Sequence, residues 1–110
     1  MNMAEIKLDK AHAGRSLSVA CGDTVVVRLD ETPTSGYRWE VAEIDPAVLK
    51  LASDDFVPAS GTTRGGGGHH EFRFEVVTAG KSPLRLIRRR PWEPASAAVE
   101  ELGATVNSSG

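Results

Sequence analysis

Histidine side chains are the first candidates for chemistry in this sequence, because they bind metals and exchange protons near neutral pH. His69 and His70 are adjacent, His12 lies far from them, and Glu71 and Glu75 follow the pair. The pair leads into an apolar pattern with the period of a β-strand, in which neighbouring side chains point to opposite faces. His69 and His70 therefore cannot easily share one ion, and the carboxylates complete no ligand set of recognised spacing. We expect two exposed histidines at the end of a loop, no metal site and no cofactor.

Cys21 and the arginines at 88–90 are the other reactive or strongly charged groups. A lone cysteine can form no internal disulfide, and the surrounding SVACGDT reads as a strand that ends in a turn. We expect Cys21 to be a small buried apolar side chain rather than a nucleophile. Consecutive arginines on a strand alternate between faces, and the 13 Lys and Arg residues are outnumbered by 15 Asp and Glu. We therefore expect no nucleic-acid partner.

The segment ETPTSGYRWE, residues 31–40, holds a polar tip between a stiff and a permissive residue. Pro33 fixes its own φ near −65°, and Gly36 can adopt a positive φ without steric cost. The tip, Thr34 and Ser35, is thus presented in a defined shape. Taken alone, the segment predicts a β-turn, and a loop held out for a partner is the alternative.

Two further segments have unusual loop composition. Four consecutive glycines run into a predicted strand rather than a helix, which argues against a phosphate-binding loop. They are Gly65, Gly66, Gly67 and Gly68. We expect a long loop over PASGTTRGGGGHH where another backbone can approach and pair, as in β-strand addition. Trp92 lies between two prolines, so it is either an exposed binding hot spot or a lid over one end of the domain.

Strands must position these loops, because apolar residues recur with a period of two and a helical period is hardly seen. The alternating sets are Val25, Val27 and Leu29; Tyr37, Trp39 and Val41; Phe72, Phe74 and Val76; Leu84 and Leu86; and Leu102, Ala104 and Val106. We expect an all-β, antiparallel β-sandwich in which Tyr37 and Trp39 enter the core. TAGKSP predicts a hairpin turn. DPAVLKLASDD predicts a turn and then a strand around 48–51, with a short helix from Pro46 as the alternative.

The bulk composition indicates one soluble domain over residues 1–110. The chain is 40% hydrophobic and 25% charged, with a net charge of −2. No apolar run approaches 18 residues, so we expect no membrane partner. The N-terminus lacks the apolar core of a signal peptide, which predicts a cytoplasmic protein, or a periplasmic or secreted one if a signal was removed. We expect a monomer.

TPTSGY, GGGG and RPW, in this order on a chain of this length, resemble the chagasin family of cysteine-protease inhibitors. The family motifs are Asn-Pro-Thr-Thr-Gly-Tyr/Phe, Gly-x-Gly-Gly and Arg-Pro-Trp, and the resemblance extends from about Leu17 to Val106. It implies an immunoglobulin-like β-sandwich with three loops at one end, which form a wedge that blocks the active-site cleft of papain-like cysteine proteases such as papain and cathepsin L-like enzymes. The resemblance implies no catalytic residue in this chain.

The resemblance also implies a role for each loop. Thr34 would sit beside the catalytic Cys and His of the protease, and Trp92 would pack on the primed side of the cleft. The glycines at 65, 67 and 68 would pair by backbone along the non-primed subsites. The residues that would shape or hold these loops are Thr32, Pro33, Ser35, Gly36, Arg90 and Pro91, with Gly66 inside the glycine run.

Two positions depart from the family pattern. Thr32 stands where the family has Asn, and Ser35 stands where it has the second Thr. The Thr32 hydroxyl can still hydrogen-bond locally, though less well than an Asn that bonds the backbone two residues on. These departures leave a second hypothesis open, in which the chain is a non-inhibitory immunoglobulin-like interaction module.

Overall fold

The structure is a computed structural model that describes residues 4–58 and 67–110. The described residues form eight strands and three short 3₁₀ turns. The strands are β1 (Glu5–Leu8), β2 (Ser16–Val19), β3 (Thr24–Glu31), β4 (Arg38–Ile44), β5 (Leu49–Pro58), β6 (Gly68–Val76), β7 (Gly80–Arg89) and β8 (Glu100–Ser108). The 3₁₀ turns are η1 (Lys10–His12), η2 (Pro33–Ser35) and η3 (Ala95–Ala97).

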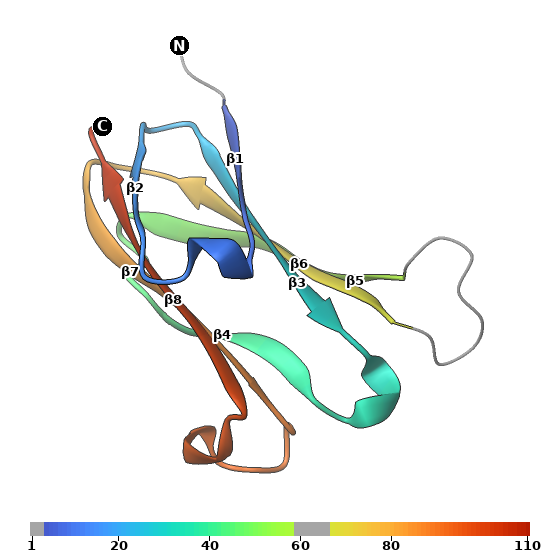
Figure 1. Ribbon diagram of the computed structural model, residues 1–110. Coiled ribbons are helices and arrows are strands. Elements are labelled where there is room, and N and C mark those ends of the chain that lie inside the picture. Colours follow the sequence, from blue (N-terminus) through green and yellow to red (C-terminus); the bar gives the residue numbers. More distant parts are fainter. Residues whose placement is uncertain (1–3, 59–66) are drawn as a thin grey trace.

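The strands form two packed four-stranded sheets, with orders β1-β3-β6-β5 and β2-β8-β7-β4 (Figure 1). The predicted β-sandwich is confirmed. The prediction of a wholly antiparallel arrangement needs a correction, because the edge pairs β1/β3 and β2/β8 are parallel. β1 and β3 belong to the first sheet, and β2, which comes between them in the sequence, belongs to the second. The chain therefore returns to the first sheet at β3 and runs in the same direction as β1.

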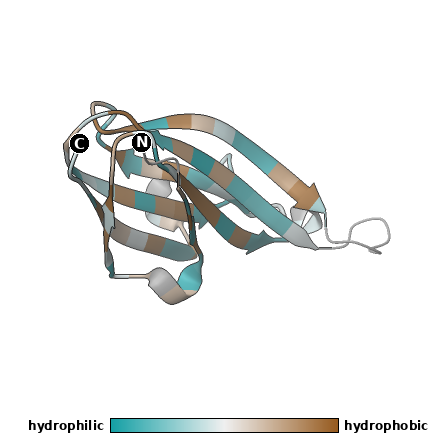
Figure 2. Ribbon diagram, turned by 90° about the horizontal axis from the view of Figure 1, so that it is seen from above, coloured by the Kyte–Doolittle hydropathy of each residue, from teal (hydrophilic) through white to brown (hydrophobic). Residues whose placement is uncertain are grey.

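The core lies between the sheets and is built from alternate residues of each strand (Figure 2). The predicted sets on β3 and β6 are all buried, and so are the predicted leucines on β7 and β8. The buried residues that pack together are Leu8, Val19, Val25, Val27, Leu29, Trp39, Val48, Leu49, Phe72, Phe74, Val76, Leu84, Leu86, Leu102 and Val106. The period of two therefore identified most of the inward face, although Ala104 is only half-buried.

Two expectations about turns had different outcomes. After β4, residues 46–48 form a turn, in which Asp45 Oδ1 accepts the Ala47 N–H at 2.9 Å, and β5 begins at Leu49. The turn followed by a strand is confirmed, and the alternative helix is wrong. TAGKSP is not a hairpin, because β6 and β7 lie in different sheets. β6 is paired on both sides, with β3 and with β5, so no edge of it is left for β7.

Cys21 differs from its prediction. It is exposed in the turn between β2 and β3, and its Sγ lies 3.5 Å from the Val77 carbonyl oxygen. Cys21 and Gly22, which form the turn after β2, are both exposed. The small apolar character of a cysteine thus did not decide its burial.

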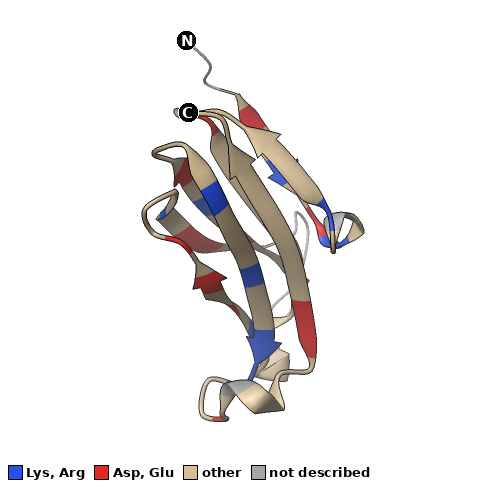
Figure 3. Ribbon diagram, turned by 90° about the vertical axis from the view of Figure 1, so that its left-hand side faces the viewer, with Lys and Arg blue, Asp and Glu red and all other residues tan. Residues whose placement is uncertain are grey.

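Charged residues of both signs lie along the strands, and their pairing follows the register. In Figure 3, the basic segments of β7 lie beside an acidic segment at the start of β8. Arg85 Nε is 3.0 Å from Glu101 Oε1, and Arg88 Nε is 3.0 Å from Glu100 Oε1.

Within the described part of the chain, no helix is long and apolar enough to cross a membrane.

The sandwich places three connections at one end. η2 joins β3 to β4, and the connection that contains η3 joins β7 to β8, while the start of β1 and the end of β8 lie at the opposite end (Figure 1). The end of β5 and the start of β6 belong to the same end as η2, because Gly68 is paired with Glu31 on one side and Pro58 on the other. The three motif segments therefore meet at this end.

Candidate functional site

The first loop is closed by its own hydrogen bonds. The Thr32 carbonyl accepts the Ser35 N–H at 3.0 Å and the Ser35 hydroxyl at 2.7 Å. The Ser35 Oγ in turn accepts the Tyr37 N–H at 3.2 Å. Pro33 begins the 3₁₀ turn, which suits its fixed φ, and Gly36 ends it with a φ of +81°. The predicted positive φ is confirmed, and Thr34 lies exposed at the tip.

The first and third loops touch each other at Gly36 and Trp92. A Cβ built on Gly36 would lie 3.3 Å from Cη2 of Trp92, so the absent side chain leaves room for the indole. Trp92 is nevertheless 72% exposed. The exposure predicted for this tryptophan is confirmed and the lid over the sandwich end is wrong, while its role as a binding hot spot stays a prediction.

Arg89 is a residue that the sequence reasoning missed. Its guanidinium donates to the Pro91 carbonyl at 3.2 Å and to the Glu93 carbonyl, and its Nη2 donates to Glu40 Oε2 on β4 at 3.2 Å. Arg89 therefore ties the backbone on both sides of Trp92 to the strand that follows the first loop. The expected alternation of the three arginines was the available signal, because it sends Arg89 away from its two neighbours.

The base of the first loop has one buried and one half-exposed aromatic residue. Trp39 is 2% exposed, and its indole N–H donates to the Asp30 carbonyl at 3.0 Å. Tyr37 does not enter the core, contrary to expectation. It precedes β4, and its ring lies under the guanidinium groups of Arg90 at 4.7 Å and Arg88 at 5.7 Å. These cation–π contacts link the first loop to the third.

The glycine segment is only partly described, because Gly65 and Gly66 lie outside the described residues. A Cβ on Gly67 would be 3.5 Å from the Thr32 hydroxyl oxygen, which places the second segment against the first loop. Gly68 belongs to β6 rather than to a loop, which shortens the expected loop at this end. A Cβ there would come within 2.3 Å of the Val57 carbonyl oxygen, so Gly68 allows β5 to approach closely.

The two histidines are strand residues, not exposed loop ends as expected. His70 is 9% exposed, and its Nδ1 lies 3.1 Å from both carboxylate oxygens of Glu31. Its Nε2 contacts Asp54, and its ring stacks on Phe72 with centroids 4.3 Å apart. His69 Nε2 lies 3.8 Å from Glu71 Oε2. The described residues contain no group of three or more His, Cys, Asp or Glu side chains that could hold a metal ion.

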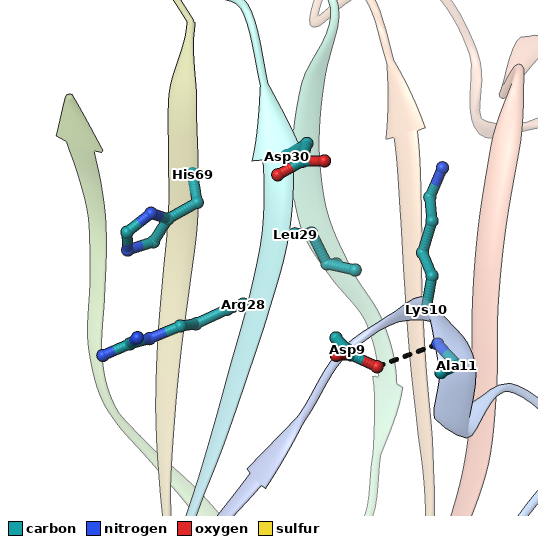
Figure 4. A pocket seen from close by; sticks show the side chains of 7 residues that line it. All are labelled: Asp9, Lys10, Ala11, Arg28, Leu29, Asp30 and His69. Atoms are coloured by element: carbon teal, nitrogen blue, oxygen red, sulfur yellow. Dashed lines mark hydrogen bonds between the residues drawn. The ribbon is translucent and has the colours of Figure 1, made fainter. Parts of the chain in front are cut away.

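A surface pocket of about 440 Å³ lies beside β3 and β6, with Asp30 and His69 in its lining (Figure 4). Side chains from η1, β3 and β6 surround it, and the Ala11 N–H donates to Asp9 at its rim. None of the predicted site residues lines it. The described parts of the three segments lie together at one end of the sandwich.

One end of the β-sandwich presents a closed polar turn, a glycine segment and an exposed tryptophan. This arrangement is typical of proteins that bind through loops. The profile of the chagasin family peptidase inhibitor I42 matches residues 18–106 of this chain. The chain is also 31% identical over 90 residues to chagasin of Trypanosoma cruzi. This match covers 78% of this chain and 82% of chagasin. This protein belongs to the chagasin family of peptidase inhibitors.

Solved structures confirm the fold. The cysteine protease inhibitor EhICP2 from Entamoeba histolytica superimposes with a TM-score of 0.85 at 21% identity and covers 98% of both chains. Amebosin gives a TM-score of 0.80 at 22% identity, over 98% of this chain and 100% of its own. PbICP-C, solved in complex with falcipain-2, gives 0.64 at 16% identity, over 99% of this chain and 93% of its own.

Proposed function

We propose that this protein is a reversible inhibitor of papain-like cysteine proteases and that its three loop segments occupy the active-site cleft. Family membership supports the inhibitor over the non-inhibitory interaction module. The observation that carries the proposal is the contact between Gly36 and Trp92, which joins two of the three motifs into one surface while Trp92 stays exposed. A solved relative of this fold binds falcipain-2.

The proposed mechanism needs no bond to be made or broken by this chain. Pro33 and the hydrogen-bonded Ser35 hold Thr34 in one conformation, so little entropy is lost when the loop enters a cleft. Thr34 would lie at the catalytic thiolate without presenting a scissile peptide in the geometry of a substrate. Trp92 would supply an apolar anchor that is desolvated on binding.

The Thr32 departure from the family pattern fits this proposal. The carbonyl of Thr32, rather than its side chain, accepts the two Ser35 bonds that close the turn. A carbonyl is present whatever the side chain, so Thr in place of Asn leaves this closure intact. The Thr32 side chain lies against Gly67 instead and fills the space between the first loop and the glycine segment.

A titration of papain tests the proposal. The folded wild-type protein should abolish hydrolysis of a small peptide substrate, reversibly on dilution, and Thr34→Ala should weaken the inhibition. Thr105→Ala, on β8 and away from the loop end, is the matched control and should inhibit like wild type. If papain and a cathepsin L-like enzyme both keep full activity in a large excess of wild-type protein, the proposed function is wrong.

A further inference from the structure

We propose that His70 is a positioning residue for the protease-binding loops, acting as an imidazolium held between Glu31 and Asp54, and that inhibition weakens when this ring loses its proton. The proposal rests on the proposed function. It also predicts how the stability of the free protein changes with pH. This proposal and the proposed function can therefore fail separately.

The sheet register places the three side chains on one face. Glu31 is the last residue of β3, His70 lies in β6 and Asp54 lies in β5. His70 is paired directly with Leu29 and Phe56, so Glu31 and Asp54 are its diagonal neighbours on either side. Diagonal neighbours on one face of a sheet are within reach of long side chains. One imidazole thus joins the three strands.

Both ring nitrogens of His70 face carboxylates. Nδ1 lies 3.1 Å from both oxygens of Glu31, and Nε2 contacts Asp54. An imidazolium donates from both nitrogens, whereas a neutral imidazole has one donor and one lone pair. Deprotonation therefore turns a lone pair toward one of the carboxylates. His70 is 9% exposed and Glu31 is 5% exposed, so water can replace little of the interaction between them. The Asp54 side chain is 46% exposed, so water can reach the contact at Nε2.

The same carboxylate controls the base of the first loop. Glu31 Oε1 accepts the Trp39 backbone N–H at 2.7 Å, and these two residues flank the loop on β3 and β4. His70 lies two residues after Gly68 on β6, and Asp54 lies four residues before the end of β5, the strand that pairs with it. A change in the Glu31–His70–Asp54 contact thus acts on the bases of two protease-binding segments together.

The other charged groups near His70 do not change charge over the relevant range. Arg38 and Glu40 on β4 and Arg89 on β7 line the adjoining clefts with His70 and Asp54. Arginine stays protonated, and ordinary carboxylates are ionised between about pH 5.5 and pH 8. His69 is the neighbouring histidine, and its Nε2 lies beside Glu71 rather than Glu31. His69 therefore offers a matched control on the same strand.

The experiment compares inhibition constants for papain at about pH 5.5 and about pH 8, the range in which histidine changes charge. The inhibition constant of each variant is divided by that of wild type at the same pH, which cancels any titration of the protease. His70→Gln should lose about three- to tenfold in affinity near pH 5.5 and much less near pH 8, as expected for a lost charge-assisted bond. His69→Gln should stay near a ratio of one. An equal ratio for His70→Gln at both pH values overturns the proposal.

Urea unfolding of the free proteins separates this proposal from the proposed function. The wild-type midpoint should fall relative to His70→Gln as the pH rises from about 5.5 to about 8, whether or not papain is bound. If His70→Gln does not fold, Asp54→Asn replaces it, because it removes the acceptor at Nε2, and its midpoint should approach that of wild type as the pH rises. A constant difference between wild type and the folded variant across this range overturns the proposal.

Discussion

Gly36 and Trp92 depend on each other across two loops. The missing Cβ of Gly36 leaves the space that the Trp92 indole occupies, and its φ of +81° aims the chain from the 3₁₀ turn into β4. Neither residue belongs to the hydrophobic core, so their importance lies in the shape of the loop end rather than in core burial.

Trp92→Ala should weaken papain inhibition by about 2 to 4 kcal/mol, as truncation of a desolvated hot-spot residue commonly does. Because the side chain is 72% exposed, the thermal midpoint should hardly change. Inhibition constants and melting curves measure both effects. Val99→Ala is the control, since Val99 is an exposed apolar residue on the same connection. Equal losses for the two variants would contradict an anchor role for Trp92.

Gly36→Ala should destabilise the fold by about 1 to 2 kcal/mol, because an L-residue with a Cβ is strained at positive φ. The new methyl also meets Trp92 Cη2 at 3.3 Å, so inhibition should weaken through the displaced indole. Gly103→Ala provides the control, because nothing lies within 4 Å of its added Cβ. Urea unfolding and papain titration are the measurements, and wild-type values for Gly36→Ala would refute the argument.

The elements that hold the loops are strand ends with polar side chains. β4 begins directly after the first loop, and its Glu40 binds Arg89 at the end of β7. Arg89 then binds carbonyls on both sides of Trp92. One guanidinium thus transmits the position of one loop to another, which a run of three arginines in a sequence does not reveal.

Arg89→Gln should leave the sandwich folded but weaken inhibition by about 1.5 to 3 kcal/mol, the range for hydrogen bonds that involve a charged group. The physical reason is that the Trp92 segment loses its fixed position before binding. Arg85→Gln is the control, because Arg85 lies on the same strand and pairs with Glu101 at the surface. Inhibition constants for both variants, with circular dichroism to verify folding, decide the outcome. If Arg85→Gln weakens inhibition as much as Arg89→Gln does, the effect comes from the loss of positive charge and not from the position of the Trp92 loop.

At the scale of the whole molecule, the sheets carry ion pairs whose strength depends on pH. Burial of the Glu71 carboxylate opposes its ionisation, but the hydrogen bonds and charges of Arg28 and Arg73 outweigh this and lower its pKa from the ordinary value of 4.5. A carboxyl group with a lower pKa in the folded state stabilises the fold above its unfolded pKa. That contribution is lost as the pH falls through the folded pKa.

The urea midpoint of wild type should therefore fall as the pH drops below about 4.5, and part of this fall should be absent in Glu71→Gln. Glu75→Gln is the comparison, because Glu75 is an exposed carboxylate four residues further along β6, whereas the partner of Arg28 is Glu71. Unfolding curves at several pH values between about 3 and 7 provide the measurement. The same acid sensitivity in Glu71→Gln and wild type would exclude the ion pair as its source.

The β-sandwich and the order of the three motifs follow from local residue patterns. Alternation through residues such as Phe72 and Phe74 predicts one buried face because side chains of a strand alternate by covalent geometry, whatever lies around them. Pro33 and Gly36 predict the shape of the first loop for an equally local reason, since their backbone preferences do not depend on distant contacts.

The side-chain partners of His70 and Arg89, and the course of the chain after β6, depend on which strands are neighbours. Local patterns do not predict them. The connection after Val76 crosses to the other sheet because both edges of β6 are already paired. His70 is buried because its strand brings it between Glu31 and Asp54, and Arg89 reaches the Trp92 segment because β7 lies beside β4. These partners are far apart in the sequence, and no local preference encodes their distance, so packing of the whole chain was needed to bring them together.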